Sequence, residues 1–126
     1  MNIFRETIIR NYVDAYNFFD VERMIRDMDE NIRFRNIQGA EVNLTLDGIA
    51  DFKRQAEQAK TFFKSRHQQI LSFKHMEDAT EIAIRYSAVL GIDFPNGLKK
   101  GQKLELNGRS VFKFEHDKIV ELTDIS

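Results

Sequence analysis

The chain has 126 residues and a mass of 14.8 kDa, which suits one domain with one hydrophobic core, spanning residues 1–126. A net charge of −1, with 42% hydrophobic and 31% charged residues, is typical of a folded globular protein and offers no basic field for nucleic acid. The absence of cysteine excludes disulfides, thiolate metal sites and a cysteine nucleophile.

The N-terminal segment has helical periodicity. Over residues 3–19 apolar side chains recur every three or four positions, which predicts a helix with one apolar stripe. Asp20 then suits the N-cap of a short second helix with the sequence VERMIRDM. The charged N-terminus does not resemble an export signal, and no apolar run approaches the roughly 20 residues of a membrane span. We therefore expect a cytoplasmic protein that contacts no membrane.

A strand and a third helix follow. The stretch NIRFRNI alternates, with Ile32, Phe34 and Asn36 facing one way, and QGAEVNLTLDG after it predicts turns and a small hairpin. Residues 47–63 return to helical spacing, with Phe52 in their apolar stripe.

The second half of the chain predicts strands. Alternation is imperfect over residues 66–76 and clean over 80–92, where Tyr86 and Ile92 share a face with four other apolar residues. The segment DFPNGLKKGQ is typical of a loop.

Two further strands end the chain, joined by a tight turn at His-Asp. The strand KLELNGRSVFKFE places Ser110 and Phe112 on one face. The closing strand KIVELTDIS places Val120, Leu122 and Asp124 on one side, so a carboxylate shares a face with two apolar residues.

This order predicts an α+β domain of two layers, with three N-terminal helices packed on a strongly curved antiparallel sheet. Such a cone encloses a pocket, and the 11 Phe and 3 Tyr residues would line it. Apolar residues also alternate with polar ones on the outer sheet face, which hints at an interface: Val89, Val111 and Ile119.

The runs NYVDAYNFFDVERM, DENIRFRN, DGIADFKRQ and GRSVFKFEHDKIVELTDIS resemble the nuclear transport factor 2-like superfamily. Within it the chain is most similar to the SnoaL-like, polyketide cyclase-like branch, which is related to ketosteroid isomerase. The resemblance covers the whole chain and implies the cone fold and a homodimer formed through the outer sheet face. It leaves the chemistry open, because this superfold hosts several kinds of enzyme as well as non-catalytic domains.

The isomerases of the family use a tyrosine and two acids, and their positions fall on Tyr12, Asn36 and Ser110. An asparagine amide has no useful basicity, so this resemblance argues against ketosteroid isomerase chemistry. The cyclases place an acid/base aspartate on the last strand, in a pattern like KIVEHWD. Here KIVELTD puts Asp124 in that position, while the histidine that the cyclases carry on the preceding strand has no counterpart in LNGRSVFKF.

Asp124 is accordingly the first candidate catalytic residue, since a carboxyl that faces an apolar cavity has a raised pKa, as a general acid requires. It could instead be solvated near the C-terminus or paired with Arg109 or Lys118. Tyr12 is the second candidate, as a hydrogen-bond donor to a ligand, although a core tyrosine is the commoner role. The predicted ligand pocket comprises Tyr16, Asn36, Phe52, Tyr86, Ser110, Phe112 and Leu122.

No other group of residues indicates a cofactor, a metal or a nucleic acid. His67, His75 and His116 lack the spacing of metal ligands and are expected at the surface. The basic segment LKKGQK is too small for a nucleic-acid site. Two functions remain: a cofactor-free acid/base enzyme of the cyclase or isomerase type acting on a small hydrophobic carbonyl compound, or a non-catalytic domain that binds such a ligand or a second copy.

Overall fold

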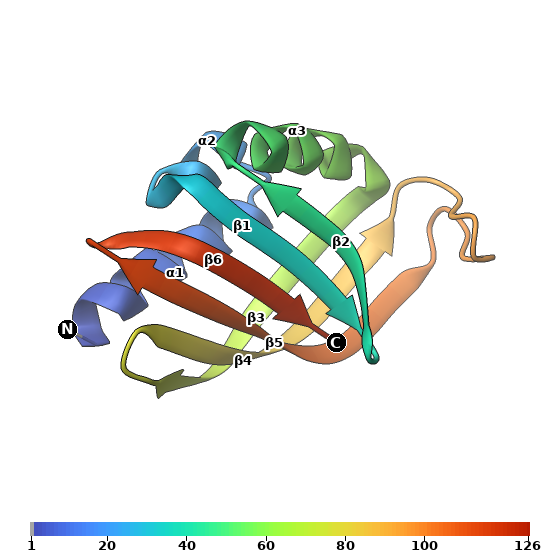
Figure 1. The fold of residues 1–126 in the computed structure, drawn as a ribbon. Coiled ribbons are helices and arrows are strands. Elements are labelled where there is room, and N and C mark those ends of the chain that lie inside the picture. The colour runs from blue at the N-terminus through green and yellow to red at the C-terminus, as the bar shows by residue number, and fades with distance from the viewer. Residues whose placement is uncertain (1) are drawn as a thin grey trace.

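The computed structural model describes residues 2–126, which form helices and a six-stranded sheet (Figure 1). In chain order the elements are α1 (Asn2–Asn17), α2 (Val21–Ile25), β1 (Met28–Gln38), β2 (Glu41–Asp47), α3 (Ile49–Ala59), the 3-10 turn η1 (Lys60–Phe62), β3 (Phe63–His75), β4 (Ala79–Leu90), β5 (Lys103–Glu115) and β6 (Lys118–Ile125). The strand order is β2-β1-β6-β5-β4-β3.

The α+β class is confirmed, whereas three details of the predicted architecture are wrong. Only α1 and α2 precede the sheet, because the hairpin β1–β2 comes before α3. The sheet is not wholly antiparallel, since β1 and β6 pair in parallel. It is also curved without being strongly curled. The parallel pair joins the first strand of the chain to the last one. No local pattern in the sequence reveals a pairing between segments so far apart.

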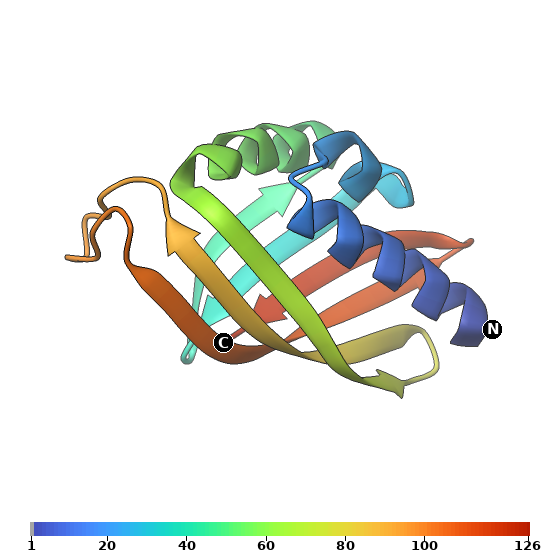
Figure 2. The same cartoon turned by 180° about the vertical axis from the view of Figure 1, so that it is seen from behind.

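The helices share one face of the sheet. Helix α1 contacts β3, and α3 contacts β1 and β2; Figure 2 shows α1 in front of the sheet and α3 along its upper edge. The Asn17 side chain fastens the end of α1 to β3, because its amide donates to the Gln68 carbonyl over 3.1 Å and its oxygen accepts from the Gln68 N–H over 2.8 Å. The buried core lies between the helices and the sheet.

The predicted cap of the second helix is confirmed, because Asp20 accepts a hydrogen bond from the Arg23 N–H over 3.2 Å. The helix ends earlier than the sequence predicts. Met28 already belongs to β1, where it pairs with Ile119 and is buried. The tight turn at His116 and Asp117 is also confirmed, since both residues have positive φ.

A bulge in β6 corrects the prediction that Ile119 lies on the outer face. Ile119 pairs with Phe114 and Glu121 pairs with Lys113, which leaves Val120 without a partner between them. Ile119 is therefore turned into the core, where it has no exposed surface. Beyond the bulge, Leu122 and Asp124 keep the predicted alternation.

Two other apolar residues, Leu71 and Ile92, are exposed instead of facing the core. The register of β3 shifts between Ile70 and Ser72, and the displaced Leu71 is exposed, which explains the imperfect alternation of this segment. Ile92 is exposed beyond the end of β4 and does not share the buried face predicted for it. No helix within residues 2–126 has the length and apolar character needed to cross a membrane.

Candidate functional site

A row of polar residues crosses the centre of the sheet. Asn36 on β1 pairs with Asp124 on β6, and Asp124 pairs with Ser110 on β5. Neighbouring residues in register point to the same face, so their side chains form one polar band beside the apolar core. Pairing across strands thus brings together three positions that are far apart in the sequence.

Asp124 is the ionisable member of this row. Its Oδ1 accepts a hydrogen bond of 2.7 Å from the Ser110 hydroxyl. Burial raises the pKa of Asp124 to about 6, although the hydrogen bond from Ser110 lowers it in part. A carboxyl with this pKa is present in both protonation states near neutral pH, so it can donate or accept a proton. The alternative pairing with Arg109 is not found, because Arg109 contacts Glu81 at 3.3 Å.

Asn36 has a separate hydrogen-bond partner. Its amide donates to the Asn43 side chain over 2.8 Å, and Asn43 in turn donates to Gln38 over 3.2 Å. These bonds orient the Asn36 amide at the edge of the row. Asn36 therefore supplies a fixed polar group to the site and no basic one.

The three tyrosines line the same region. Tyr12 is buried, and its ring packs edge-on against Phe112 with 5.6 Å between the ring centres. The Tyr16 and Tyr86 hydroxyls share a hydrogen bond of 3.0 Å. Burial raises the pKa of all three phenols above its ordinary value, and the Asp124 charge raises that of Tyr12 further. All three are neutral hydrogen-bonding groups at pH 7.

A cavity of about 280 Å³ lies between α1, α3 and the sheet. Its polar lining residues include Asp124, Asn36 and Tyr12, and Phe52 is among its apolar ones. A second cavity of about 180 Å³ shares Tyr16, Asn36 and Asp124 with the first and adds Tyr86. The rest of the larger cavity is mainly apolar: Met24, Phe34, Leu44, Leu46, Ala56, Ala59, Phe62 and Phe63.

The structure also places the remaining predicted pocket residues. Phe112 and Leu122 have no exposed surface and belong to the core, because α1 covers this part of the sheet. Ser110 is buried and reaches the site through its bond to Asp124.

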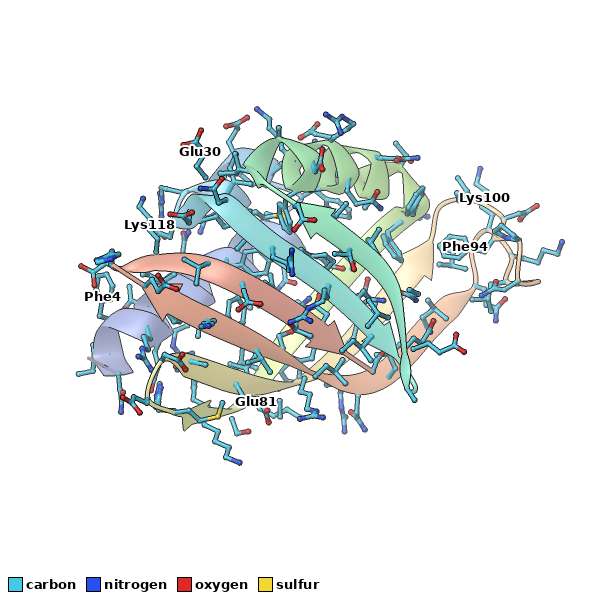
Figure 3. The ribbon with its side chains drawn as sticks, in the orientation of Figure 1. Phe4, Glu30, Glu81, Phe94, Lys100 and Lys118 are labelled. Carbon is cyan, nitrogen blue, oxygen red and sulfur yellow. The ribbon has the colours of Figure 1, made fainter. Side chains whose placement is uncertain are left out.

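The loop between β4 and β5 reaches the same end of the molecule as η1. Phe94 in this loop packs against Phe62 and Phe63, with ring centres 6.0 and 6.3 Å apart. In Figure 3 Phe94 and Lys100 lie together on this loop, at the opposite end of the molecule from Phe4. The Phe62 and Phe63 walls of the cavity are therefore supported from outside by a third ring.

The prediction of surface histidines is wrong for His75. Its ring nitrogens contact the Thr80 hydroxyl at 2.9 Å and the Glu6 carboxylate at 2.7 Å, and its side chain is only 18% exposed. His75 is covered because α1 packs on β3 and its Glu6 contacts the His75 ring. Among residues 2–126, no cluster of three or more histidine and acidic side chains has the geometry of a metal site.

Arg66 lines the larger cavity and was not among the predicted site residues. It lies on β3, where only 6% of the residue is exposed, and its guanidinium is 3.7 Å from the centre of the Tyr16 ring. A signal was available in the sequence, because Arg66 alternates with Gln68 and Ile70 and so faces inward with them. The irregular alternation later in β3 obscured it.

The family model "SnoaL-like domain" matches residues 9–122. No curated protein sequence matches.

Solved structures show the same fold at low sequence identity. One is a protein proposed to be a polyketide cyclase from Xanthomonas campestris pv. campestris, with 16% identity, a TM-score of 0.83 and coverage of 98% of this chain and 90% of that one. TerC, co-crystallised with polyporic acid, has 14% identity, a TM-score of 0.77 and coverage of 97% and 90%. A protein with a ketosteroid isomerase-like fold from Catenulispora acidiphila, in complex with trimethylamine, has 11% identity, a TM-score of 0.75 and coverage of 93% and 82%.

Proposed function

The chain belongs to the SnoaL-like domain family, and we propose that its cavity binds a small hydrophobic carbonyl compound on which Asp124 acts as general acid and base. The observation that carries the proposal is the position of Asp124. Its carboxyl lines the cavity, and its pKa is raised to about 6. A catalytic group works best when its pKa lies near the working pH.

The proposed reaction moves a proton on carbon and requires no cofactor. Ionised Asp124 takes a proton from the carbon beside the carbonyl. The electron pair of that C–H bond forms a C=C bond, and the C=O π pair moves to the carbonyl oxygen. Tyr12, a neutral donor that lines the same cavity, hydrogen-bonds to this oxygen as its charge develops. Protonated Asp124 then returns the proton to a carbon of this enolate, the C=C pair forms the new C–H bond and the C=O bond re-forms. Asn36 orients the ligand.

This scheme differs from that of ketosteroid isomerase. Asn36 and Ser110 stand where the family's isomerases carry acids, and neither side chain can take a proton from carbon. Ser110 instead donates a hydrogen bond to Asp124 and lowers its pKa in part. Only one residue of the row is therefore assigned acid/base work.

A pH titration of Asp124 by carboxyl NMR tests the proposal directly. We expect a midpoint near 6, whereas a midpoint near the ordinary value of about 4 would remove the basis for acid/base catalysis. In Ser110→Ala the midpoint should move upward, because the hydrogen bond that favours the charged form is lost. An unchanged midpoint in this variant would mean that the Ser110 bond does not act on Asp124.

The second candidate function is a non-catalytic domain that binds the same class of ligand. It is favoured by the hydrogen-bond partner of Asp124 in the row, which is a serine and neither an acid nor a histidine. Exchange of the α-protons of 2-tetralone for deuterium, followed by NMR, separates the two functions. The enzyme exchanges them faster than buffer does, and Asp124→Asn binds 2-tetralone without this exchange. A wild-type protein that binds 2-tetralone and exchanges no protons is a binding domain.

The ligand itself is not determined by family membership. Two of the similar structures hold chemically unlike molecules, polyporic acid in one and trimethylamine in the other. The homodimer implied by the family resemblance likewise stays a prediction. Its expected interface, the outer sheet face, carries the ion pairs Arg109–Glu81 and Lys113–Glu121 beside Val111. Light scattering after size exclusion tests the dimer.

A further inference from the structure

The cavity contains a positive charge that the proposed reaction does not use. Arg66 lines the cavity, and only 6% of this residue is exposed. A guanidinium is charged at every pH at which proteins are folded. Arginine is rarely buried to this extent unless a partner compensates its charge.

The protein holds this guanidinium in place on two sides. It lies 3.7 Å from the centre of the Tyr16 ring and 4.4 Å from that of Phe19, which are cation–π distances. Phe19 has a φ of +59°, a backbone conformation that costs free energy for a residue other than glycine. The Arg66 Nε also donates to the Tyr16 carbonyl over 2.9 Å. The orientation of Arg66 is therefore built into the fold.

One terminal nitrogen of the guanidinium has no hydrogen-bond partner among residues 2–126. Nη2 of Arg66 is buried and makes no hydrogen bond. No carboxylate between residues 2 and 126 comes within ion-pair distance, 4.0 Å, of Arg66, Asp124 included. Arg66 is also not among the groups that set the pKa of Asp124, which follows from burial and from the hydrogen bond with Ser110. A buried charged donor that the chain leaves unsatisfied indicates an acceptor from outside the chain.

The other residues that line the cavity indicate the chemical character of the ligand beyond the group that binds Arg66. Around Arg66 the cavity is lined by aromatic and aliphatic side chains, Phe62 and Phe63 nearest to it in the sequence. A planar carboxylate matches the two N–H groups of a guanidinium edge, and an aromatic body matches apolar walls. The volume of about 280 Å³ limits that body to a small molecule. Tyr12 lines the same cavity as both charges, and besides burial the Asp124 charge raises its pKa while the Arg66 charge lowers it.

Resting on the proposed function, we infer that the substrate is a small aromatic acid whose carboxylate is bound by the Arg66 guanidinium, with its reacting carbon directed to Asp124. Arg66 is then a binding and positioning residue, and Asp124 remains the group that moves the proton. The inference adds a substrate class, aromatic carboxylates, that neither the family nor the sequence pattern supplied.

A matched pair of probes tests this inference. Binding of 2-naphthoate and of its neutral analogue 2-naphthamide is measured by calorimetry at pH 7 on the wild-type chain and on three variants. We expect the wild-type protein to bind the carboxylate at least about tenfold more tightly, as is typical of hydrogen bonds to a charged group. Arg66→Met, which keeps an apolar side chain of similar length, should lose this preference. Arg66→Lys should keep part of it, because lysine keeps the charge and loses the planar fork.

Arg85→Met is the control, because Arg85 is an exposed arginine on the adjacent strand β4 and does not line the larger cavity. It should preserve the wild-type preference. Equal binding of the two probes to the wild-type chain, or an unchanged preference in Arg66→Met, overturns the inference and leaves the proposed function standing. If neither probe binds, the inference fails as well, and exchange of the 2-tetralone α-protons still decides the proposed function. A preference for naphthoate together with an Asp124 midpoint near 4 supports the inference and removes only the catalytic proposal.

Discussion

Strands β5 and β6 carry two adjacent pairs of inward-facing residues with opposite properties. Phe112 pairs with Leu122, and neither has any exposed surface. The next pair on the same face is Ser110 with Asp124, joined by a hydrogen bond of 2.7 Å, and Asp124 lines the cavity. The strands are the same, so the difference comes from what covers them. Helix α1 packs over the first pair through Tyr12, whereas the cavity opens over the second.

One sheet thus supplies both stability and an ionisable group that lines a cavity. The apolar pair contributes free energy of folding by burial. The polar pair costs free energy, because the carboxylate is held in surroundings that favour its neutral form. A substitution in the apolar pair should therefore lower the free energy of unfolding, whereas removal of the Asp124 charge should raise it.

The largest effect is expected at the apolar pair. Phe112→Ala should lower the free energy of unfolding by about 3–5 kcal/mol, because a large buried ring is lost and α1 cannot collapse fully into the space. Urea denaturation measures this loss. Val111→Ala, on the opposite face of the same strand, is the control and should cost much less. Similar losses in both variants would mean that Phe112 does not anchor the core.

The polar pair should behave in the opposite way. The folded chain raises the pKa of Asp124 to about 6, so between about pH 4 and pH 6 the folded state binds a proton that the unfolded state releases. Stability from this group is thus greatest below pH 4 and is lost as the pH rises through 6. Asp124→Asn should remove this loss and raise the free energy of unfolding at pH 8 by about 2–3 kcal/mol.

Urea denaturation at pH 4, 6 and 8 checks this expectation. The gain of Asp124→Asn over the wild-type chain should grow with pH across these points. Asp117→Asn makes the same chemical change in the exposed turn between β5 and β6 and should show no such trend. A wild-type chain that is more stable at pH 8 than Asp124→Asn would contradict the placement of the carboxyl in a desolvated site.

The smallest effect is expected at the rim of the site. Tyr86→Phe removes the 3.0 Å hydrogen bond with Tyr16 while keeping the ring, and should lower the free energy of unfolding by about 0.5–1.5 kcal/mol. A double-mutant cycle with Tyr16→Phe isolates the bond, because the second substitution costs little once the first has removed its partner. Fully additive losses would show that the two hydroxyls are stabilised separately.

Local patterns predicted much of the fold. The periodicity of the first helix, the Asp20 cap, the turn at His116 and Asp117 and the alternation through Tyr86 all depend on residues close in sequence. Bulges were the main source of error. One unpaired residue, Val120, reverses the direction of Ile119 relative to Leu122, and no residue type marks such a position.

The candidate site likewise contains residues that local patterns predicted and one that they did not. Asp124, Asn36 and Ser110 were found because alternation and family resemblance both place them on the inner face, and their pairing across β1, β6 and β5 puts them in one row. Arg66 was missed, because a charged residue in a strand is ordinarily assigned to solvent. Its burial depends on Tyr16 and Phe19, which come from a helix and a loop about 50 positions earlier in the chain.

The sequence by itself determined the α+β class, the approximate position of most elements and an aspartate directed inward on the last strand. These follow from side-chain periodicity, which is a property of neighbouring residues. Only the tertiary structure decided that β6 lies between β1 and β5, that Ser110 bonds to Asp124, and that Arg66 lines the cavity with its Nη2 buried and unpartnered among residues 2–126. Each of these depends on segments brought together by folding, and the raised pKa of Asp124 arises there as well, because desolvation exists only once the core has formed.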